Sequence, residues 1–346
     1  MLTDKQVAFL REELALAKNP LFFYDGDADG LTAFLLLYRL HREGKGFALS
    51  TTSTLGEQFL RKVEEFNPDK IFVLDIPLVT QEFIDGAKRP IFWIDHHPVQ
   101  DRTGVHYYNP RIKEPSAYIP TSRMAWQVSE RPEDLWIAVA GSLADWHAPD
   151  ELLDQFVQRY PLLLPEKSDL ATMIYTQPVG KLVKFFFFIQ KGPSSEVRKS
   201  IKVLTRINAP EEIFEQQNAA GKFLFKRFAA INQKYEAVLT KAKKVVTSSK
   251  IILYKYTENE WSFTVNLANE LMAFYPDKYV VIARQKSGEM KCSLRGKNIL
   301  SLLQRALVGV SGSGGGHDDA CGAVIKEEDW DIFFRNLNEA VTASSI

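Results

Sequence analysis

The stretch LFFYDGDADG, residues 21–30, decides the fold class of this chain, because a short apolar run ends there in carboxylates and glycines. The apolar residues Leu21 to Tyr24 predict a buried strand, and the run from Leu31 to Leu40 predicts a buried helix directly after it. The turn between them holds three carboxylates within five residues: Asp25, Asp27 and Asp29. A buried strand therefore reaches the surface at a concentration of negative charge.

The same alternation of strand and helix recurs along the N-terminal half of the sequence. Strands are predicted at residues 46–50, 70–74 and 90–94, and helices at residues 55–66 and 79–87. Such alternation is typical of right-handed crossovers that build a mostly parallel sheet with helices on both faces. Ligands of these α/β sheets bind beyond the carboxyl ends of the strands, so we expect the chemistry there.

The C-terminal part of the sequence predicts a second, smaller α/β domain. Residues 209–246 predict one long helix, because their apolar positions recur at intervals of three and four residues. Beyond it we expect strands at residues 250–256, 278–285 and 289–295, and helices at 265–275, 298–307 and 328–342. The expected organisation is a catalytic domain at 1–208, a connecting helix at 209–246 and a smaller domain at 247–346, with the active site in the cleft between the domains.

Composition excludes several classes of protein. The 346 residues include 43 Lys and Arg against 43 Asp and Glu, so no overall positive charge attracts the chain to a polyanion. The cysteines, Cys292 and Cys321, lie in no disulfide framework and in no pattern that would hold zinc. The N-terminus lacks the apolar core of a signal peptide, and apolar runs such as Phe185 to Ile189 are too short to span a membrane. We therefore expect a cytoplasmic protein without a membrane partner.

The first carboxylate cluster could be either a structural turn or a metal-binding site. Asp27 and Asp29 are two residues apart, so in extended backbone their side chains point the same way, and their mutual repulsion is costly without a cation. In the structural interpretation, the cluster is a polar turn that caps the next helix. A calcium-binding loop is excluded, because no glutamate stands at its twelfth position. A metal site and a helix cap both remain open for this cluster alone.

Later strand ends and turns add further polar side chains. Asp75 ends an apolar run, and on its own it would be interpreted as a helix cap. His96 and His97 are adjacent and project to different sides, so one can bind a metal while the other faces substrate. Asp145 follows an apolar segment rich in small residues. Separate segments thus bring Asp, His and Asp side chains toward one edge, which capping alone explains poorly. Oxygen ligands with one imidazole suit magnesium or manganese better than zinc, and two such ions about 4 Å apart serve phosphoryl transfer.

In this order the motifs resemble those of the DHH phosphoesterases, a family named for the triplet that reads Asp95-His96-His97 here. The match also includes the first motif at residues 25–30, the strand end at Asp75 and the segment 141–145. The resemblance implies that two divalent ions, manganese with magnesium as the alternative, are bound by Asp27, Asp29, Asp75, His96 and Asp145. It further implies that Asp75 bridges both ions, that His97 contacts the scissile phosphate, and that Asp25 and Asp95 orient the metal-binding side chains.

The second domain resembles the DHHA1 substrate-binding domain. The resemblance rests on the strand Lys291 to Gly296 and on a glycine run that ends in a histidine, formed by Gly314, Gly315, Gly316 and His317. Arg295 at a strand end can hold a phosphate with a fork of N–H donors, and glycines expose backbone N–H groups to the same anion. Composition alone would make residues 311–316 a flexible linker. With Arg295 and His317 beside it, we expect a loop that binds substrate phosphate.

The resemblance implies a manganese-dependent phosphodiesterase or exonuclease that hydrolyses single-stranded or short oligonucleotides, RNA or DNA, to mononucleotides. Water activated by the two metals would be the nucleophile. The alternative with the same metal site is a hydrolase of polyphosphate, pyrophosphate or cyclic dinucleotides. An alternative of another class is a structural subunit of a replication or repair complex, and the intact set of expected ligands argues against it. A homodimer or membership of such a complex is compatible with each of these functions.

Overall fold

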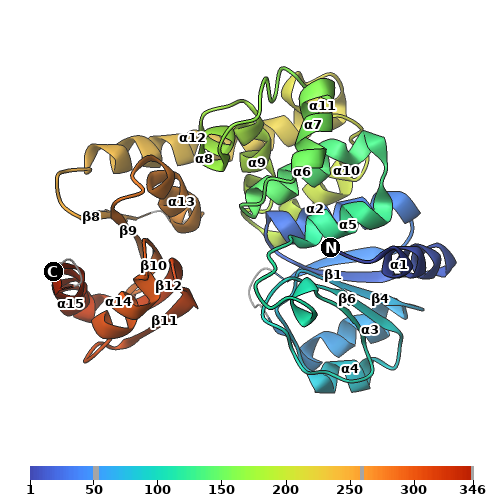
Figure 1. The fold of residues 1–346 in the computed structure, drawn as a ribbon, viewed down its shortest axis with the longest axis horizontal. Helices are drawn as coiled ribbons and strands as arrows, with labels where there is room; N and C mark the ends of the chain where they lie inside the picture. Colours follow the sequence, from blue (N-terminus) through green and yellow to red (C-terminus); the bar gives the residue numbers. More distant parts are fainter. Residues whose placement is uncertain (50–53, 258–260, 344–346) are drawn as a thin grey trace. The chain divides into compact units, whose positions relative to one another are not determined.

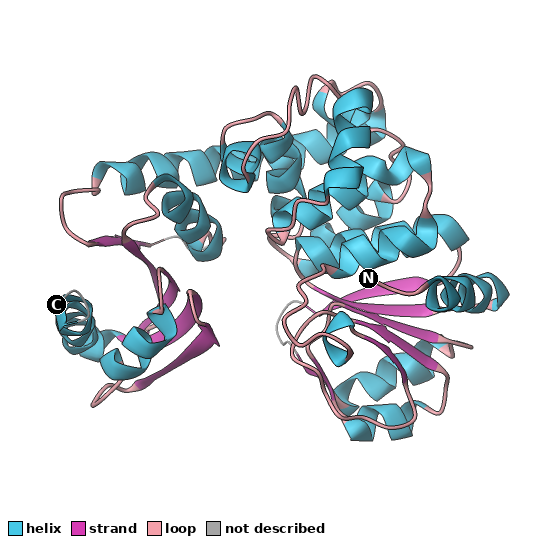
Figure 2. Cartoon of the chain, in the orientation of Figure 1, coloured by secondary structure: helices cyan, strands magenta, loops and turns pink. Residues whose placement is uncertain are grey.

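The computed structural model describes residues 1–49, 54–257 and 261–343 of the chain. The chain divides into two compact units, Met1–Phe228 and Ala229–Ile346. Each unit has its own five-stranded sheet, and Figures 1 and 2 trace both sheets and the helices around them. Among the described helices, none combines the length and the apolar character that crossing a membrane requires.

The first unit contains a sheet whose strands all run parallel, in the order β2-β1-β4-β6-β7. Its strands are β1 (Leu21–Asp25), β2 (Lys45–Leu49), β4 (Ile71–Leu74), β6 (Ile91–Ile94) and β7 (His106–Tyr108). A small parallel pair lies apart from this sheet and consists of β3 (Thr54–Leu55) and β5 (Leu78–Val79). The expected parallel α/β sheet is confirmed.

Aromatic side chains align the strands of this sheet. Phe22, Phe72, Phe92 and His106 are register partners on successive strands. Their rings stack with centroid distances of 5.2, 5.1 and 5.0 Å from one strand to the next. Stacked aromatic pairs add to the stability that burial alone provides, and the three phenylalanine rings of this row are buried. Because a parallel register is fixed along the whole strand, this row also fixes which residues meet at the carboxyl edge.

Helices cover both faces of the sheet. Figure 1 shows α2 (Ala28–His41) and α5 (Thr121–Ser129) on one face, and α3 (Leu60–Phe66) and α4 (Gln81–Ala87) on the other. The other helices of this unit are α1 (Asp4–Leu16), α6 (Leu135–Ala144), α7 (Asp150–Arg159), α8 (Leu170–Tyr175), α9 (Val179–Phe188), α10 (Ser194–Leu204) and α11 (Pro210–Phe214). Helix α6 approaches α2 closely at Gly141, where an added Cβ would lie 2.0 Å from Oγ1 of Thr32. This close approach sets the position of the residues that follow α6.

The expectation of one long helix at residues 209–246 is wrong in its first part. The structure has the short helix α11, then a break, and then α12 (Ala219–Lys244). Gln216 adopts a φ of +56° between them, a left-handed conformation that cannot continue a right-handed helix. The apolar positions that predict the helix, from Leu224 to Ala242, all lie within α12, and residues 215–218 at the break are polar. The division between the two units falls within α12.

The second unit contains a mixed sheet in the order β11-β12-β10-β9-β8. Only β8 and β9 pair in parallel, and the other pairs are antiparallel. The elements are β8 (Ile251–Tyr256), α13 (Thr264–Phe274), β9 (Tyr279–Lys286), β10 (Glu289–Arg295), α14 (Ile299–Ala306), β11 (Gly312–His317), β12 (Ala320–Lys326) and α15 (Trp330–Ala343). The sheet packs on an apolar core that includes Leu294, Leu303 and Phe333, and this confirms the expected smaller α/β domain.

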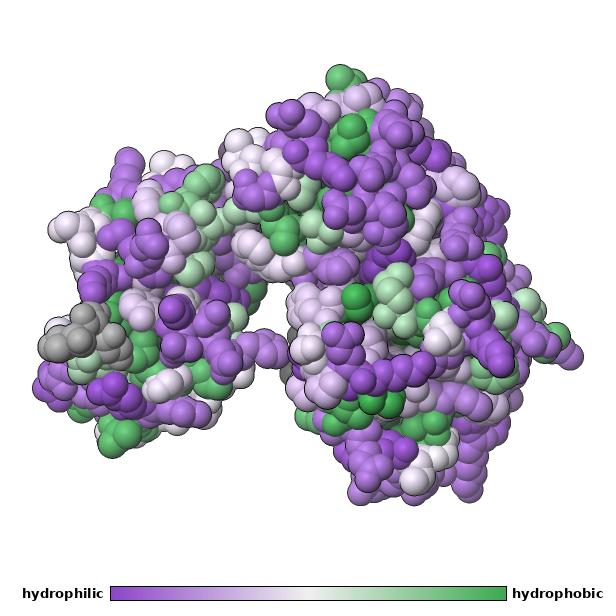
Figure 3. Space-filling model, viewed as in Figure 1, coloured by the Kyte–Doolittle hydropathy of each residue, from purple (hydrophilic) through white to green (hydrophobic). Residues whose placement is uncertain are grey.

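The glycine run expected to form a loop is instead the edge strand β11. It pairs with β12 from Gly312 to His317, and Gly315 lies opposite Gly322. The backbone hydrogen bonds of this antiparallel pair outweigh the low intrinsic strand preference of glycine. Composition pointed to a loop because it carries no information about the partner strand. Figure 3 shows hydrophilic residues over much of the visible surface, with apolar residues scattered among them.

Candidate metal centre

The parallel register places the key carboxylates in one row. Tyr24, Leu74, Ile94 and Tyr108 are register partners on β1, β4, β6 and β7. The next residue on each strand is polar, in the order Asp25, Asp75, Asp95 and Asn109. The row continues through backbone hydrogen bonds, because the N–H of Asp75 donates to Ile94 and the N–H of Asp95 donates to Tyr108. The carboxyl edge of the sheet is therefore lined with oxygen ligands.

The first motif brings Asp25, Asp27 and Asp29 to this edge in different ways. Asp27 caps α2, since its Oδ1 accepts from the N–H of Gly30 at 2.9 Å. Asp29 lies in the first turn of α2 and is only 2% exposed. The capping interpretation is thus correct for Asp27 without excluding a metal, because each carboxylate oxygen has a second lone pair.

Asp29 is held by the start of another helix. The backbone N–H of Thr121 donates to its Oδ2 at 2.7 Å, and that of Ser122 donates to its Oδ1 at 2.9 Å. Both residues lie in the first turn of α5, where backbone N–H groups have no partner within the helix. The positive end of the helix dipole also favours a carboxylate there. Asp29 is therefore fixed in position before any cation binds.

Asp75 lies at the centre of the cluster. It is 1% exposed, and its backbone adopts a φ of +62°, which is rare outside glycine and directs the chain sharply away from β4. Oγ1 of Thr121 donates to its Oδ1 at 3.1 Å. Asp75 belongs to a group with Asp25 and Asp27 and to a second group with His96 and His97, and within each group the ligand atoms lie within 4.8 Å of one another.

His96 and Asp145 complete the cluster from β6 and α6. Nε2 of His96 lies 3.3 Å from Oδ1 of Asp75 and 3.6 Å from Oδ2 of Asp145. Asp145 directly follows α6, and its Oδ2 also accepts from the hydroxyl of Tyr118 at 2.9 Å. Asp29, His96 and Asp145 form a third group with ligand atoms within 4.8 Å. The structure thus brings together all the predicted metal-binding side chains.

His97 points to a different partner from His96, as expected for adjacent residues. Its Nδ1 lies 2.8 Å from Oδ1 of Asp95, and its backbone N–H donates to Oδ2 of the same carboxylate at 3.1 Å. Asp95 is fully buried and also accepts from Tyr107 and Asn109, each at 3.3 Å. This network fixes the orientation of the His97 ring, and Nε2 is the ring nitrogen that Asp95 does not contact.

The burial and close spacing of these carboxylates shift the pKa values of the cluster. Burial, together with the neighbouring carboxylates, raises the pKa of Asp25 to about 7 and that of Asp145 to about 9. The pKa values of Asp27 and Asp75 rise for the same two reasons. Burial also acts to lower the pKa of His97, but the hydrogen bond and charge of Asp95 outweigh it and the net shift is upward.

The residues present fit divalent metal ions. Buried carboxylates this close together are unfavourable as anions unless protons or cations neutralise them. Their raised pKa values result first from burial and then from their mutual repulsion. Nδ1 of His96 is also buried without a hydrogen-bond partner in the described part of the chain. A donor set of carboxylate oxygens with one imidazole matches magnesium or manganese. We conclude that this edge is a candidate metal centre.

The second unit places the expected phosphate-binding residues on one sheet face. Arg295 pairs with Ala320, and Ala320 pairs with His317 on the other side, so the three lie in one row across β10, β12 and β11. Directly paired residues of an antiparallel sheet project from the same face, and two strands span about 10 Å. Nε of Arg295 donates to Oδ1 of Asn269 at 2.7 Å, which orients the guanidinium. His317 and Gly314 to Gly316 are exposed.

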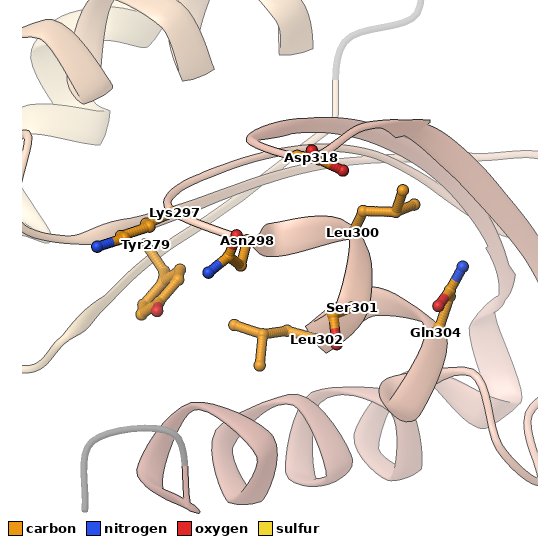
Figure 4. A pocket seen from close by; sticks show the side chains of 8 residues that line it. All are labelled: Tyr279, Lys297, Asn298, Leu300, Ser301, Leu302, Gln304 and Asp318. Atoms are coloured by element: carbon orange, nitrogen blue, oxygen red, sulfur yellow. The ribbon is translucent and has the colours of Figure 1, made fainter.

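A cavity of about 610 Å³ opens next to this row. Lys297, Asn298 and Asp318 line it together with the N-terminal part of α14, and Figure 4 shows the Lys297 and Tyr279 side chains at one side of it. Asn298 adopts a φ of +54° immediately before α14. The cavity is polar and carries both a cation and a carboxylate, so its charge alone does not select an anionic ligand.

Comparison with known proteins identifies the second unit. Residues 250–343 match the DHHA1 domain family. The resemblance of the second unit to the DHHA1 domain is confirmed for these residues. No curated protein sequence matches the chain.

Several solved structures share the fold of this chain at low sequence identity. RecJ from Thermus thermophilus in complex with Mn²⁺ has a TM-score of 0.68 and 17% identity over 98% of this chain, and this chain spans only 54% of that protein. Exonuclease RecJ bound to manganese has a TM-score of 0.60 and 18% identity, with 97% and 94% of the two chains covered. A DHH domain from a member of a ribosomal protein family has a TM-score of 0.65 and 14% identity, covering 97% and 89%.

Sequence reasoning missed the residues that position the carboxylates of this candidate metal centre. Thr121 holds both Asp29 and Asp75, Tyr118 holds Asp145, and Asn109 holds Asp95. All three come from residues 109–121, a segment without apolar periodicity. The only local signal is Pro120 before Thr121, which is compatible with a helix start but says nothing about its target.

Proposed function

We propose that this chain is a divalent-metal-dependent phosphodiesterase that removes nucleotides from the end of single-stranded or short oligonucleotides. The observation that supports it is the cluster of Asp25, Asp27, Asp75, His96 and Asp145, gathered at one sheet edge with raised carboxylate pKa values. Such a cluster is costly for stability, so its presence favours a function that uses cations there. The fold shared with the protein named exonuclease RecJ supports a nucleic acid as substrate.

The residues divide into roles that suit phosphoryl transfer. Asp27, Asp29, Asp75, His96 and Asp145 would hold two divalent ions, which activate water and neutralise the charge that develops on phosphate. His97, oriented by Asp95 and with a raised pKa, would donate a proton from Nε2 to a phosphate oxygen. Asp25 would stay in contact with the cluster and orient Asp27. Arg295 and His317, on one face of the second sheet, would hold the phosphate of the terminal nucleotide.

Other phosphate substrates would use the same centre. A two-metal cluster acts on any phosphoanhydride or phosphodiester that reaches it, so polyphosphate and cyclic dinucleotides need a direct comparison. The substrate class is therefore decided by what binds beyond the reacting phosphate, as is usual for enzyme specificity. A purely structural subunit would have no need of the cluster.

The test measures product release from defined substrates. Purified protein is incubated with Mn²⁺ and end-labelled RNA or DNA, from dinucleotides upward, beside polyphosphate and cyclic dinucleotides. We expect mononucleotides from the oligonucleotides, no release after chelation, and loss of turnover by more than 1000-fold in Asp75→Asn. Asp85→Asn removes an exposed carboxylate on α4 and is the matched control, with unchanged turnover. Phosphate release from polyphosphate alone, or equal activity in Asp75→Asn, would refute the proposal.

A further inference from the structure

A groove on the first unit lies between the edge strand β2 and helix α10. Its volume is about 530 Å³, and it is lined from β2 by Lys45 and Phe47 and from α10 by Arg198 and Lys202. Tyr38 of α2 forms part of its wall. Strand β2 is the outer strand of the parallel sheet, so no further strand covers this side in the described chain. The candidate metal centre described above does not include any of these residues.

The wall of the groove is aromatic. Tyr24 and Phe34 stack beneath it with ring centroids 4.6 Å apart, and the Tyr38 ring lies 5.3 Å from that of Phe34. Tyr38 and Phe47 are half-buried, so part of each ring remains accessible. Gly46 on β2 allows this packing, because an added Cβ would lie 2.5 Å from the Phe34 ring. Accessible aromatic rings offer stacking surfaces to nucleobases of any sequence.

The rim of the groove is positively charged. Lys45, Arg198 and Lys202 are exposed, and none of the described residues that line the groove is acidic. A neighbouring cavity shares Tyr38 with the groove and adds Arg42 and Arg206, also without an acidic lining residue in the described chain. Such a concentration of cations is notable in a chain whose formal net charge is +0. Local positive charge of this kind attracts a phosphate backbone.

Two residues that line the groove contact the backbone of the first carboxylate motif. Gln190 lines the groove, and its side-chain amide donates to the backbone carbonyl of Asp27. Leu49 lines it as well, is the register partner of Asp25, and accepts from the N–H of Gly26 at 2.8 Å. One end of the groove therefore lies against the backbone that carries the first carboxylates. A chain bound there can place a phosphate at the centre.

We propose that this groove binds the part of a single-stranded oligonucleotide that extends beyond the nucleotide being removed. Bases stack on Tyr38 and Phe47, and phosphates pair with Lys45, Arg198 and Lys202. This inference rests on the proposed function, because it assigns a binding surface to the remainder of the oligonucleotide substrate proposed there. It adds a binding surface on the first unit and predicts that affinity increases with strand length.

The test measures binding without hydrolysis. Fluorescence anisotropy in EDTA gives the Kd of a labelled eight-nucleotide strand for the wild type and for Arg198→Glu/Lys202→Glu. We expect Kd to rise at least 10-fold, and the slope of log Kd against log salt to fall by about 1.4, since each lost phosphate contact contributes about 0.7. Lys199→Glu reverses the same charge on α10 outside the groove, where its amine lies 5.0 Å from the Phe223 ring centroid, and should change Kd less than 2-fold.

A second variant tests whether the groove prefers nucleic acid to other polyanions. Tyr38→Leu removes the stacking surface and keeps the charge, so it should weaken the eight-nucleotide strand at least 5-fold and leave a polyphosphate of equal length unaffected. Equal loss for both ligands would overturn nucleic acid as the occupant. Thermal melting of each variant verifies that the fold is retained.

The outcomes distinguish this inference from the proposed function. If the wild type hydrolyses oligonucleotides but Arg198→Glu/Lys202→Glu binds like Lys199→Glu, the groove is refuted and the function stands. If the wild type binds in EDTA with the expected variant pattern but never hydrolyses, the groove stands and the function falls. In an active enzyme the loss of kcat/KM in the double variant should be larger for the eight-nucleotide strand than for a dinucleotide.

Discussion

The carboxylate cluster of the candidate metal centre should make the metal-free protein lose stability as pH rises. Asp145 has a pKa of about 9 in the folded chain, against 3.8 for the unfolded value. Its carboxyl therefore keeps a proton in the fold that it loses in the unfolded chain at any pH between these values. The stability contributed by this group is complete below pH 3.8 and is lost as pH rises through about 9.

The size of the effect follows from proton linkage. One proton bound only by the folded state changes the free energy of unfolding by about 1.4 kcal/mol per pH unit. Between pH 5 and pH 8 this proton alone corresponds to a loss of about 4 kcal/mol, a large share of the stability of an ordinary domain. The other carboxylates of the cluster act in the same direction, but they interact with Asp145 and their contributions do not add.

The assay is urea unfolding in EDTA at several pH values for the wild type and for Asp145→Asn. The amide has no proton to lose and can still accept from the Tyr118 hydroxyl, so the variant should lose about 1.4 kcal/mol per pH unit less than the wild type. Taking the difference between the two proteins cancels the contributions of groups outside the cluster. Saturating Mn²⁺ should reverse the trend for the wild type, because bound cations replace the protons. If the free energies of unfolding of the wild type and of Asp145→Asn change equally with pH in EDTA, this account of the cluster is refuted.

Further predictions concern single contacts. Asp95→Asn removes the carboxylate that lies 2.8 Å from Nδ1 of His97, and a charge-assisted hydrogen bond of about 1.5–3 kcal/mol corresponds to a fall in kcat of about 10- to 100-fold, measurable as dinucleotide turnover. An unchanged pH–rate profile would contradict the role given to His97. Asp134→Ala removes the carboxylate that lies 2.7 Å from the buried guanidinium of Arg39, and it should lower the free energy of unfolding of the first unit by about 3–5 kcal/mol in denaturant unfolding. A decrease of under about 1 kcal/mol would mean that water reaches the charge of Arg39. Gly141→Ala forces a Cβ to within 2.0 Å of Oγ1 of Thr32 and should lower the free energy of unfolding by about 1–3 kcal/mol. An unaltered melting temperature would show that α2 and α6 can move apart to accommodate the methyl group.

The strand ends that carry the chemistry could be located from the sequence. Apolar runs that stop at Asp25, Asp75 and Asp95 follow the rule that ligands bind beyond the carboxyl ends of parallel strands, and the register confirms that these residues share one row. The pattern of strand and helix predicted the parallel sheet because both periodicities are local properties of the chain. The mixed sheet of the second unit was predicted less completely: β11 has the composition of a loop, and β12 was not among the predicted strands.

Local patterns could not predict which distant backbone or side chain would hold each ligand. The N–H groups of Thr121 and Ser122 fix Asp29 from 92 and 93 residues away, and the hydroxyl of Tyr118 fixes Asp145. The groove between β2 and α10 likewise combines residues from segments that share no motif. Contacts of this kind have no signature in a single sequence, because they depend on how helices dock on the sheet.

The sequence by itself thus determined the chemical types at the strand ends and the class of the sheet, because hydrophobic periodicity and the identity of the next residue are written along the chain. Only the tertiary structure decided how near these groups come and how far their pKa values move. Proximity and burial arise when separate elements pack together, and they turn ordinary aspartates such as Asp145 into a site that requires a proton or a cation.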